Sequence, residues 1–541
     1  MPQVRLELTL DGFVFVGGHR RIPPGGRDSR AALHRAAPGK PRLTQERRAT
    51  VVGGGIAGVA AAAVLAERGA SVTLIERDNR LGGRVSAWPI NGERTMSRGF
   101  HAFFRQYYAM RALVRRADPT LSRLIPIDDY PLQRPDGMRD SFAAIPRTPP
   151  FSVIGFVLQS PSFPIRALAS VNIPAAVELM LVRFPGLHER YEGESAAAFL
   201  DRLRFPASAR DLALEVFARS FFADPDAFSA GELVSMFHSY FIGSAEGLLF
   251  DVPNDDYETA IWAPMREYLE GIGVTMRTET EVVAISETGV KLTGGEQVPS
   301  DAVVLAADPR RARELIRSIR SDDEAVRSWQ EAAAQTHNAP PFVVVRLWLE
   351  GRVRADRPAF LGTSGYGLLD NISVLERFER GAREWSKVHG GSVVELHAYA
   401  CDEAVRDDES ALAETVDELQ RQLHRAFPEV VGMRVLEREV LVRDDCTVIE
   451  PTGWAQRPGV QTPLPWLTLA GDWVRIERPV ALMERAASTG FEAANALLAG
   501  WGVRGEDVFS APMRGLLAWP TRGRTGSRSR CSAGTLRGGN R

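Results

Sequence analysis

The spacing of apolar residues predicts that strands and helices alternate from residue 49 onward. The run ATVV at 49–52 is short and rich in β-branched residues, which favours a strand. An alanine-rich stretch at 53–70 follows and predicts a helix that ends at Gly69. The apolar run SVTLIER at 71–77 predicts a second buried strand. A strand, a glycine-rich turn, a helix and a strand form a βαβ unit, so we expect a parallel sheet.

The pattern changes twice further along the chain. Residues 120–265 carry apolar stretches, many prolines and helical patches, which we interpret as a mostly helical insert. Strands return after this insert, and DAVVLAAD at 301–308 predicts a buried strand that ends in a turn of small residues. Apolar runs at 340–350 and 391–399 predict a second sheet. Residues 466–498 close the body with a strand and a long helix of small residues.

The glycines between the first strand and helix have the spacing Gly53-x-Gly55-x-x-Gly58. The first permits a tight turn, the second lets the backbone approach a pyrophosphate, and the third lets the helix pack closely. Glu76 lies eighteen residues after Gly58, at the end of the second strand. A carboxylate there accepts hydrogen bonds from both ribose hydroxyls and repels a 2′-phosphate. The motif therefore favours FAD or NAD over NADP, and the alternative is a structural turn beside a surface glutamate.

Two further motifs favour FAD in particular. RLGGR at 80–84 places paired glycines and Arg84 just past Glu76, where they suit a second diphosphate contact. Gly471 and Asp472 end a late strand and precede a long helix, whose N-terminal part favours negative charge on a flavin. The alternative for Asp472 is that of a loop aspartate that caps this helix.

These motifs, together with DAVVLAAD, resemble the flavin amine oxidase and phytoene desaturase superfamily over nearly all of residues 49–500. The resemblance implies FAD as the cofactor. Val282 is expected to hold the adenine through its backbone. The cofactor-binding residues implied are Gly53, Gly55, Ile56, Ala57, Gly58, Glu76, Arg77, Gly82, Gly83, Arg84, Gly99, Phe100, His101, Val282, Ala306, Gly471, Asp472, Val480 and Met483.

The fold class that follows is α/β. We expect a Rossmann-like FAD-binding domain with an inserted helical and mixed-sheet substrate domain. The expected segments are a flexible basic lead-in (1–48), three FAD-binding parts (49–119, 266–310 and 465–502), a mostly helical substrate- or membrane-facing insert (120–265), a substrate domain with the second sheet (311–464), and a disordered tail rich in Arg, Gly and Ser (503–541).

Longer strings narrow the resemblance. GFHAFF at 99–104 is similar to the GLHIFF stretch of plant-type phytoene and ζ-carotene desaturases, although Arg98 and Arg105 depart from it. MSRGFHAFFRQYY, FARSFFADP, MFHSYFIGSAEGLLFDVP and RPVALMERAASTGFEAAN closely resemble carotene desaturase/methyltransferases of the isorenieratene synthase type. This resemblance implies desaturation of the β-ionone ring of β-carotene or γ-carotene with a 1,2-methyl migration. The alternatives are another FAD-dependent carotene desaturase or isomerase, a flavin amine oxidase, and a non-catalytic isoprenoid-binding protein.

The candidate catalytic and substrate-binding residues lie among aromatic side chains. His101 and His238 are the candidates for proton exchange, because histidine titrates near neutral pH, and a buried structural role is the alternative for each. An apolar tunnel would surround the carotenoid and stabilise positive charge through aromatic faces, and core packing is the alternative. The candidate tunnel residues are Phe103, Phe104, Phe221, Phe222, Phe237 and Phe241.

Charge and cysteine content limit the partners. Residues 1–48 and 503–541 each carry six more basic than acidic side chains, which leaves about −14 on the body between them, so we expect no nucleic-acid partner. Three dispersed cysteines indicate neither a disulfide framework nor a metal site and suit the cytoplasm. An insoluble carotenoid requires collection from a membrane, so we expect peripheral attachment to its inner face through the apolar segment 148–182. A quinone and oxygen remain alternative electron acceptors.

Overall fold

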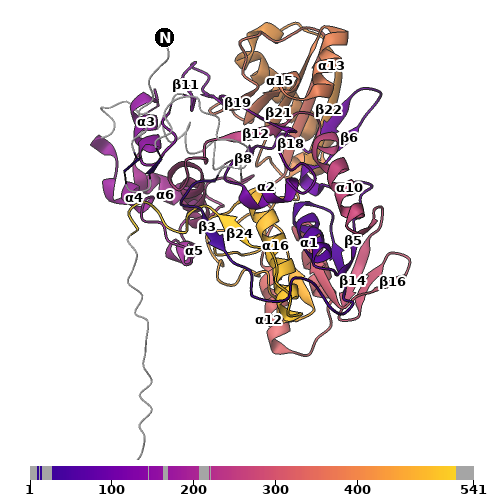
Figure 1. The fold of residues 1–541 in the computed structure, drawn as a ribbon. Helices are drawn as coiled ribbons and strands as arrows, with labels where there is room; N and C mark the ends of the chain where they lie inside the picture. The colour runs from indigo at the N-terminus through magenta and orange to yellow at the C-terminus, as the bar shows by residue number, and fades with distance from the viewer. Residues whose placement is uncertain are drawn as a thin grey trace, which may run out of the picture.

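A five-stranded parallel sheet organises the half of the molecule that carries the glycine motif (Figure 1). The computed structural model describes residues 9–10, 13–14, 27–143, 145–162, 169–205, 219 and 221–518. The strands, in spatial order, are β13 (Thr275–Arg277), β5 (Ser71–Ile75), β4 (Arg48–Val52), β17 (Ala302–Leu305) and β23 (Leu467–Leu469). All neighbours pair in parallel, which confirms the predicted βαβ unit and sheet.

Two helices of small residues pack against each other beside this sheet. They are α1 (Ile56–Glu67) and α16 (Leu482–Gly500), and both contact its strands. Every residue of α1 except Glu67 is buried. A Cβ on Gly490 of α16 would lie 2.2 Å from the Ala57 carbonyl oxygen, so only glycine permits this close approach. Because α1 follows β4 and α16 follows β23, both helix N-termini lie at the carboxyl edge of the sheet.

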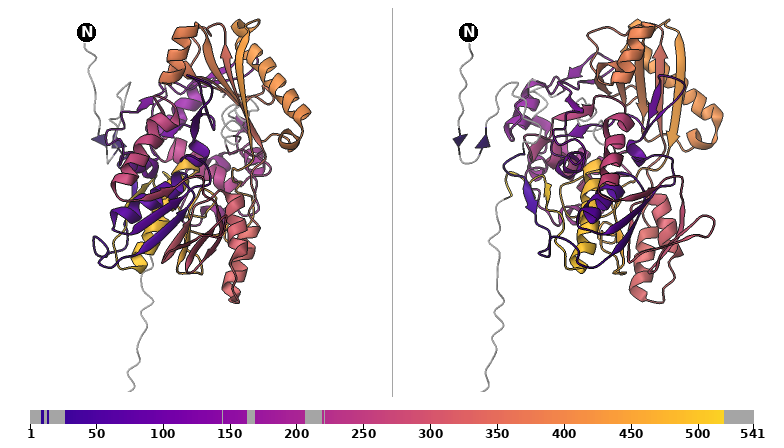
Figure 2. Two further views of the ribbon diagram at one scale, coloured as in Figure 1. Left: turned by 90° about the vertical axis from the view of Figure 1, so that its right-hand side faces the viewer. Right: turned by 45° about the vertical axis from the view of Figure 1, so that its right-hand side comes forward.

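A seven-stranded sheet forms the second layer, and Figure 2 shows it above the parallel sheet. It confirms the second sheet predicted at 340–350 and 391–399. Its strands pair antiparallel except for β10 with β19. The order is β11 (Arg139–Asp140), β10 (Leu132–Gln133), β19 (Phe360–Thr363), β20 (Asn371–Val374), β21 (Ser392–Ala398), β18 (Phe342–Leu349) and β22 (Val435–Arg443).

The two faces of this sheet belong to different cores. Along β18, Val343, Val345 and Leu347 pack with residues of α15 (Glu409–Ala426) in a separate apolar cluster. The alternate positions Phe342 and Val344 join the main core instead. The second face therefore looks toward the rest of the molecule, where the cavity described below lies.

Where the structure describes it, the predicted insert at 120–265 contains both helices and strands, and two of these strands belong to a small antiparallel sheet. The helices are α3 (Phe151–Gln159), α4 (Ile173–Glu178), α5 (Leu187–Arg190), α6 (Ala196–Leu203), α9 (Ala230–Phe237) and a π-helix (His238–Ile242). The small sheet has the order β8 (Phe103–Phe104), β12 (Phe250–Pro253) and β9 (Leu124–Pro126). Part of FARSFFADP lies outside the described residues.

Shorter elements connect these layers. The hairpin of β6 (Ala87–Pro89) and β7 (Thr95–Ser97) follows RLGGR, and a meander lies next to the parallel sheet. The meander consists of β14 (Val282–Ser286), β15 (Gly289–Leu292) and β16 (Gln297–Pro299). Further α-helices among the described residues are α2 (Tyr108–Val114), α10 (Ala263–Gly271), α11 (Pro309–Ser318), α12 (Glu324–Ala334), α13 (Arg380–His389) and α14 (Ala404–Asp407).

The two chain ends depart from the expected tails. Residues 32–34 form β3, which pairs antiparallel with β24 (Val508–Ser510). Val503 and Val508 are buried. The segment 503–518 is therefore part of the body, whereas the basic ends at 1–8, 15–26 and 519–541 lie outside the described residues. Composition did not reveal this pairing because it joins segments that are more than 470 positions apart.

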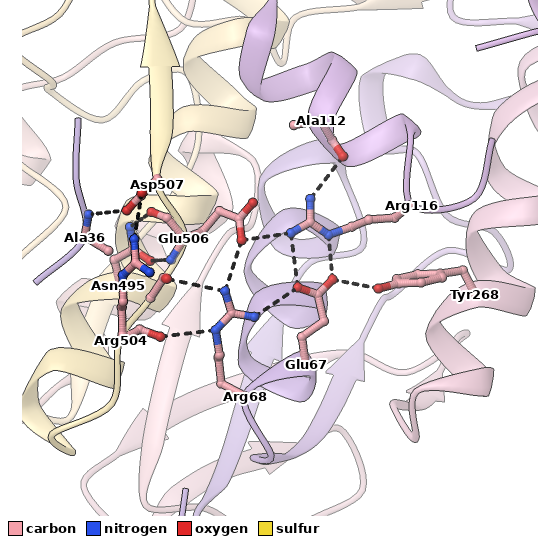
Figure 3. A network of polar contacts seen from close by, with 11 residues as sticks. Ala36, Glu67, Arg68, Ala112, Arg116, Tyr268, Asn495, Arg504, Glu506 and Asp507 are labelled. Atoms are coloured by element: carbon pink, nitrogen blue, oxygen red, sulfur yellow. Dashed lines mark hydrogen bonds and ion pairs between the residues drawn. The ribbon is translucent and has the colours of Figure 1, made fainter. Parts of the chain in front are cut away.

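Ion pairs fasten this C-terminal segment to α1 and α2, as Figure 3 shows. Glu506 accepts from Arg68 at 3.2 Å and pairs with Arg116 at 3.3 Å. Arg116 also donates to Glu67 at 2.6 Å, and Tyr268 of α10 donates to the same carboxylate. Glu506 thus ties the C-terminal segment to two arginines that follow α1 and α2.

Candidate functional site

The glycine motif between β4 and α1 is shaped for close backbone approach. Gly53 has a φ of +109°, and a Cβ there would lie 2.5 Å from the carbonyl oxygen of Ala306. A Cβ on Gly58 would lie 1.9 Å from the carbonyl oxygen of Gly53. In front of Gly55, by contrast, the nearest atom to such a Cβ is the Gly83 Cα at 4.0 Å. Gly53 and Gly58 hold the turn, and Gly55 leaves space where a pyrophosphate fits.

The RLGGR turn lies directly against this motif. Gly82 donates a backbone hydrogen bond to the Gly54 carbonyl at 2.9 Å, and Gly55 and Gly82 form a parallel bridge. Both turns sit at the N-terminus of α1, whose unpaired N–H groups favour an anion. Two motifs that are nearly thirty residues apart in sequence therefore form one cradle.

Glu76 is held at the end of β5 by backbone donors. Its carboxylate accepts from Gly54 N–H at 2.6 Å and from Asp78 N–H at 2.9 Å. Burial raises the pKa of Glu76, and the two backbone hydrogen bonds act in the opposite direction. A carboxylate has about four acceptor positions, so it retains capacity for ribose hydroxyls.

Arg84 and Asp472 bring the second and third motifs together. The Arg84 guanidinium donates to Asp472 Oδ1 at 2.5 Å. Gly471 has a φ of +142°, and a Cβ there would lie 2.8 Å from the Trp473 ring, so this turn also requires glycine. Asp472 thus sits between the end of β23 and α16 as predicted, and its carboxylate is oriented by Arg84.

One cavity runs past all of these groups. Most of the predicted cofactor positions line it: Gly53, Gly55, Ile56, Ala57, Glu76, Arg77, Gly82, Gly83, Arg84, Phe100, His101, Val282, Ala306, Gly471, Asp472 and Met483. Gly58, Gly99 and Val480 do not line it. Gly58 packs on Gly53, Gly99 packs on His397, and the Val480 carbonyl accepts from Arg485 at 2.9 Å.

The same cavity continues into an aromatic chamber. Of the predicted tunnel residues, Phe104, Phe221 and Phe222 line it. Phe103, Phe237 and Phe241 are buried and do not line it, so the structure gives them core positions. Sequence reasoning missed most of the chamber, whose further aromatic residues are Tyr107, Tyr130, Tyr240, Phe250, Phe342, Phe360 and Tyr399. The strand pairing of Phe250 with Phe104 brings two of these rings within 5.4 Å.

The two candidate histidines have different surroundings. His101 lines the cavity, and its Nδ1 lies 2.8 Å from the Gly99 carbonyl oxygen. His238 does not line the cavity, and its Nε2 lies 2.6 Å from the Pro512 carbonyl oxygen. Burial lowers the pKa of each to about 4, so both rings are neutral near pH 7. The position of His238 fits the structural alternative, because it fastens the C-terminal segment.

A polar wall that sequence reasoning missed faces the chamber. Asn371 of β20, and His397 and Tyr399 at the end of β21, line the cavity. Behind His397 lie the buried side chains of Glu395 and Arg346. The signal was present in the sequence VELHAYA, where Glu395, His397 and Tyr399 occur at every second position of an apolar strand.

Comparison with known protein families identifies the family to which the chain belongs. The family of flavin containing amine oxidoreductases matches residues 56–498, which is most of the chain. The chain belongs to this family. It is an FAD-dependent oxidoreductase, and the cradle geometry suits the dinucleotide part of that cofactor. The predicted superfamily, fold class and cofactor are therefore confirmed.

Individual relatives narrow the comparison. The chain is 52% identical over 507 residues to the carotenoid phi-ring synthase of Streptomyces griseus, covering 92% of this chain and 96% of that protein. It is 26% identical to the carotenoid phi-ring synthase of Chlorobaculum tepidum, covering 88% and 92%. Cyclohexylamine oxidase from Brevibacterium oxydans shares the fold with a TM-score of 0.59 at 14% identity, covering 84% and 99%.

Neither a membrane-spanning helix nor a metal cluster is found in the described part of the chain. No helix there is both long and apolar enough to cross a bilayer. Within the same residues, His, Cys, Asp and Glu side chains do not gather in a group of three or more that could hold a metal ion.

Proposed function

We propose that this flavoenzyme desaturates the β-ionone ring of β-carotene or γ-carotene and moves one methyl group, which gives an aromatic end group. The observation that carries the proposal is the single cavity that joins the glycine cradle to the aromatic chamber. Such a cavity suits a substrate whose reacting ring is apolar. The high identity with a carotenoid phi-ring synthase over almost the whole chain supports it.

The cofactor end of the cavity is proposed to hold FAD through groups already described. The N-terminus of α1 and the two glycine turns bind the diphosphate, and Glu76 binds the adenosine ribose. Asp472, oriented by Arg84, binds the ribityl and diphosphate region. When bound there, FAD supplies a two-electron oxidant that accepts hydride.

The chamber residues are proposed to protect the positive charge that hydride loss leaves on the ring. The faces of Phe104, Tyr240 and Phe250 stabilise a cation by about 0.5–2 kcal/mol each, depending on how completely water is excluded. A largely apolar enclosure also keeps water from trapping the cation. His101 contributes a neutral ring to this wall.

A ring C–H bond breaks and its electron pair leaves with the hydride. A geminal methyl group then migrates with its bonding pair to the neighbouring cationic carbon. The new cation loses a proton, and the electrons of that C–H bond form a ring double bond. A second desaturation completes the aromatic ring, so each reacted ring loses four hydrogens and no carbon.

Expression of the chain in a host that makes β-carotene tests this proposal. We expect a pigment whose mass is lower by four hydrogens for each ring that reacts, measured by mass spectrometry. Parallel feeding of γ-carotene and phytoene identifies the substrate class. Consumption of phytoene alone would overturn the ring chemistry and favour a linear desaturase. The Gly55→Ala chain, which closes the open part of the cradle, is the control and should leave the pigment unchanged.

A lipid bilayer is the proposed partner for the exposed face of α3. Phe151, Ile154 and Leu158 are 41%, 50% and 66% exposed, and their spacing of three and four places them on one helix face. The opposite face carries Phe156, whose ring stacks on Phe142 at 5.3 Å, and Phe142 stacks in turn on Tyr130 of the chamber. These stacked rings connect the exposed face of α3 to Tyr130 in the cavity wall.

Liposome flotation tests this surface. We expect Leu158→Asp to reduce the bound fraction severalfold and to lower turnover of carotene supplied in vesicles. Val388→Asp is the matched control, because Val388 is 72% exposed on α13 in the second layer. Equal flotation of both variants would show that α3 is not the docking face. The electron acceptor is identified by supplying either a membrane quinone or oxygen and measuring which of them sustains turnover.

A further inference from the structure

Strand β21 turns one row of polar side chains toward the cavity. Glu395, His397 and Tyr399 occupy alternate positions, so they share one face of the sheet. The intervening residues Leu396 and Ala398 pack in the separate core beneath α15. Glu395 and His397 are 0% and 2% exposed, so the row is enclosed by protein except where it meets the cavity.

Hydrogen bonds connect this row continuously. Tyr399 Oη lies 2.9 Å from His397 Nδ1, and His397 Nε2 lies 2.8 Å from Glu395 Oε1. The other oxygen of Glu395 accepts from Arg346 Nε at 2.9 Å and from Arg346 Nη2 at 2.6 Å. Arg346 is the register partner of Glu395 on β18, so the sheet itself fixes this pair.

The charge state of Glu395 assigns the proton on His397. Burial acts to raise the pKa of Glu395, but Arg346 and His397 overcome it and hold the pKa at about 2. An ionised carboxylate only accepts hydrogen bonds, so His397 Nε2 carries the hydrogen. The Phe100 N–H also approaches this nitrogen, at a longer 3.3 Å. His397 Nδ1 is therefore left with a lone pair.

The Tyr399 hydroxyl completes the chain at the cavity wall. Burial raises the pKa of Tyr399, so the phenol keeps its hydrogen and donates it to His397 Nδ1. Asn371 Nδ2 donates to the same hydroxyl oxygen at 3.0 Å. Asn371 Oδ1 is buried without a hydrogen-bond partner and belongs to a residue that also lines the cavity. The phenol oxygen thus has an acceptor for its own proton and a donor that stabilises it.

His101 lacks this support. Its Nδ1 lies against the backbone carbonyl of Gly99, and burial together with the positive charges of Arg98 and Arg84 lowers its pKa, which disfavours an imidazolium. A proton placed on His397, by contrast, lies against the carboxylate of Glu395. Of the two histidines at this cavity, His397 is the one built to receive a proton.

We propose that Tyr399 takes the proton from the substrate cation and passes its own proton to His397, with Glu395 and Arg346 as positioning residues. The substrate C–H bond breaks and its electrons form the new double bond. The proton binds Tyr399 Oη as the phenol hydrogen moves to His397 Nδ1, which leaves an imidazolium paired with Glu395. Nothing is oxidised in this step, since the hydride has already left. The inference rests on the proposed function only in requiring that a proton follow a hydride.

A single-turnover experiment on the full-length, FAD-loaded protein in vesicles tests this proposal. Loss of the yellow cofactor absorbance without oxygen reports hydride removal, and chromatography reports the product. We expect Tyr399→Phe to retain the absorbance change and to slow product formation by about 10²–10⁴-fold, the usual contribution of a positioned proton acceptor. The solvent deuterium isotope effect on product formation should disappear in the same variant, which a structural role would not cause.

Tyr366→Phe is the matched control. Tyr366 is buried in the separate core, and its hydroxyl accepts from Gln133 at 2.9 Å, away from the cavity lining. Product formation by Tyr399→Phe at the rate of Tyr366→Phe would overturn the proposal. If Tyr399→Phe fails to retain FAD, His397→Gln gives the same test, because an amide orients the phenol but accepts no proton.

Failure of the proposed ring chemistry can be distinguished from failure of the proposed role of Tyr399. A wild-type chain that ignores β-carotene but consumes phytoene would reject the ring chemistry alone. Linear desaturation also releases a proton after a hydride, so the same variants are then measured on phytoene. An unchanged product rate and isotope effect there would reject the role of Tyr399 as well.

Discussion

The two ends of the cavity are built by different means. At the cofactor end, the main chain makes the shape: Gly53, Gly58 and Gly471 stand where any Cβ would strike a neighbour. At the substrate end, side chains from β8, β12, β20, β21 and the helical insert make the shape. The first end depends on the absence of side chains and the second on their chemistry. We therefore expect cofactor retention and substrate turnover to respond to different substitutions.

The largest effect is expected at Gly58. Gly58→Ala places a Cβ 1.9 Å from a backbone oxygen, which the close-packed turn cannot relieve locally. The protein should lose FAD and fold poorly, as measured by cofactor absorbance per chain and thermal unfolding. Gly55→Ala is its counterpart, because the space there is open. It should lose FAD while the chain without cofactor unfolds at the wild-type temperature. Equal unfolding temperatures for both variants would contradict this division.

Glu395 gives the next largest effect, at the substrate end. Glu395→Gln leaves the buried charge of Arg346 without its main partner, so the free energy of unfolding should fall by about 3–5 kcal/mol in urea titrations. Glu395→Asp retains the negative charge, so its free energy of unfolding should fall by less. A loss below about 1 kcal/mol for Glu395→Gln would mean that Glu379, which lies 3.9 Å from Arg346, takes over the pairing.

The pH dependence of stability should separate the two ends as well. The pKa of Glu395 is held at about 2, below its ordinary value, so its stabilisation is present at neutral pH and is lost as pH falls toward 2. Glu484 caps α2 near the cofactor end, and burial raises its pKa to about 8. Its stabilisation is fully present below its ordinary pKa of 4.5 and is lost as pH rises from there to about 8. Glu484→Gln should flatten the unfolding profile between about pH 4.5 and 8 and leave the loss toward pH 2 unchanged.

The smallest effect is expected for a single chamber ring. Phe104→Leu removes an aromatic face whose centroid lies 4.5 Å from that of Tyr240, and turnover should fall about tenfold with FAD content unchanged. Phe103→Leu is the neighbouring control, since Phe103 is fully buried and does not line the cavity. It should lower stability but leave turnover per FAD unchanged. A reversed outcome would mean that Phe104 acts through packing.

The glycine cradle could be predicted from the sequence because its requirements are local. Fixed glycine spacing describes a turn completely, so Gly53, Gly55 and Gly58 could be placed before any tertiary contact was known. The parallel sheet followed from the same unit. Asp472 needed only its position at a strand end. Each of these predictions depends on the backbone of a short segment.

The substrate end could not be read in the same way. Asn371 and Tyr399 meet because β20 and β21 pair in one register, and the sequence does not state that register. Six phenylalanines were equally good candidates, yet three of them, including Phe237 and Phe241, face the core. The composition of residues 503–518 resembles that of a disordered tail, so their place in the fold could not be predicted from it. Packing between distant segments decided all three cases.

The strand order of the parallel sheet has a consequence for synthesis on the ribosome. β17 separates β4 from β23, so a nascent chain must emerge past residue 469 before the last strand can join, and past 500 before α16 packs on α1. Until then the glycine cradle lacks Asp472 and one flank. Loading of FAD is thus a late event in the life of each chain, and a premature stop before residue 467 would yield an apoprotein in which β17 is an open sheet edge, which is prone to aggregate.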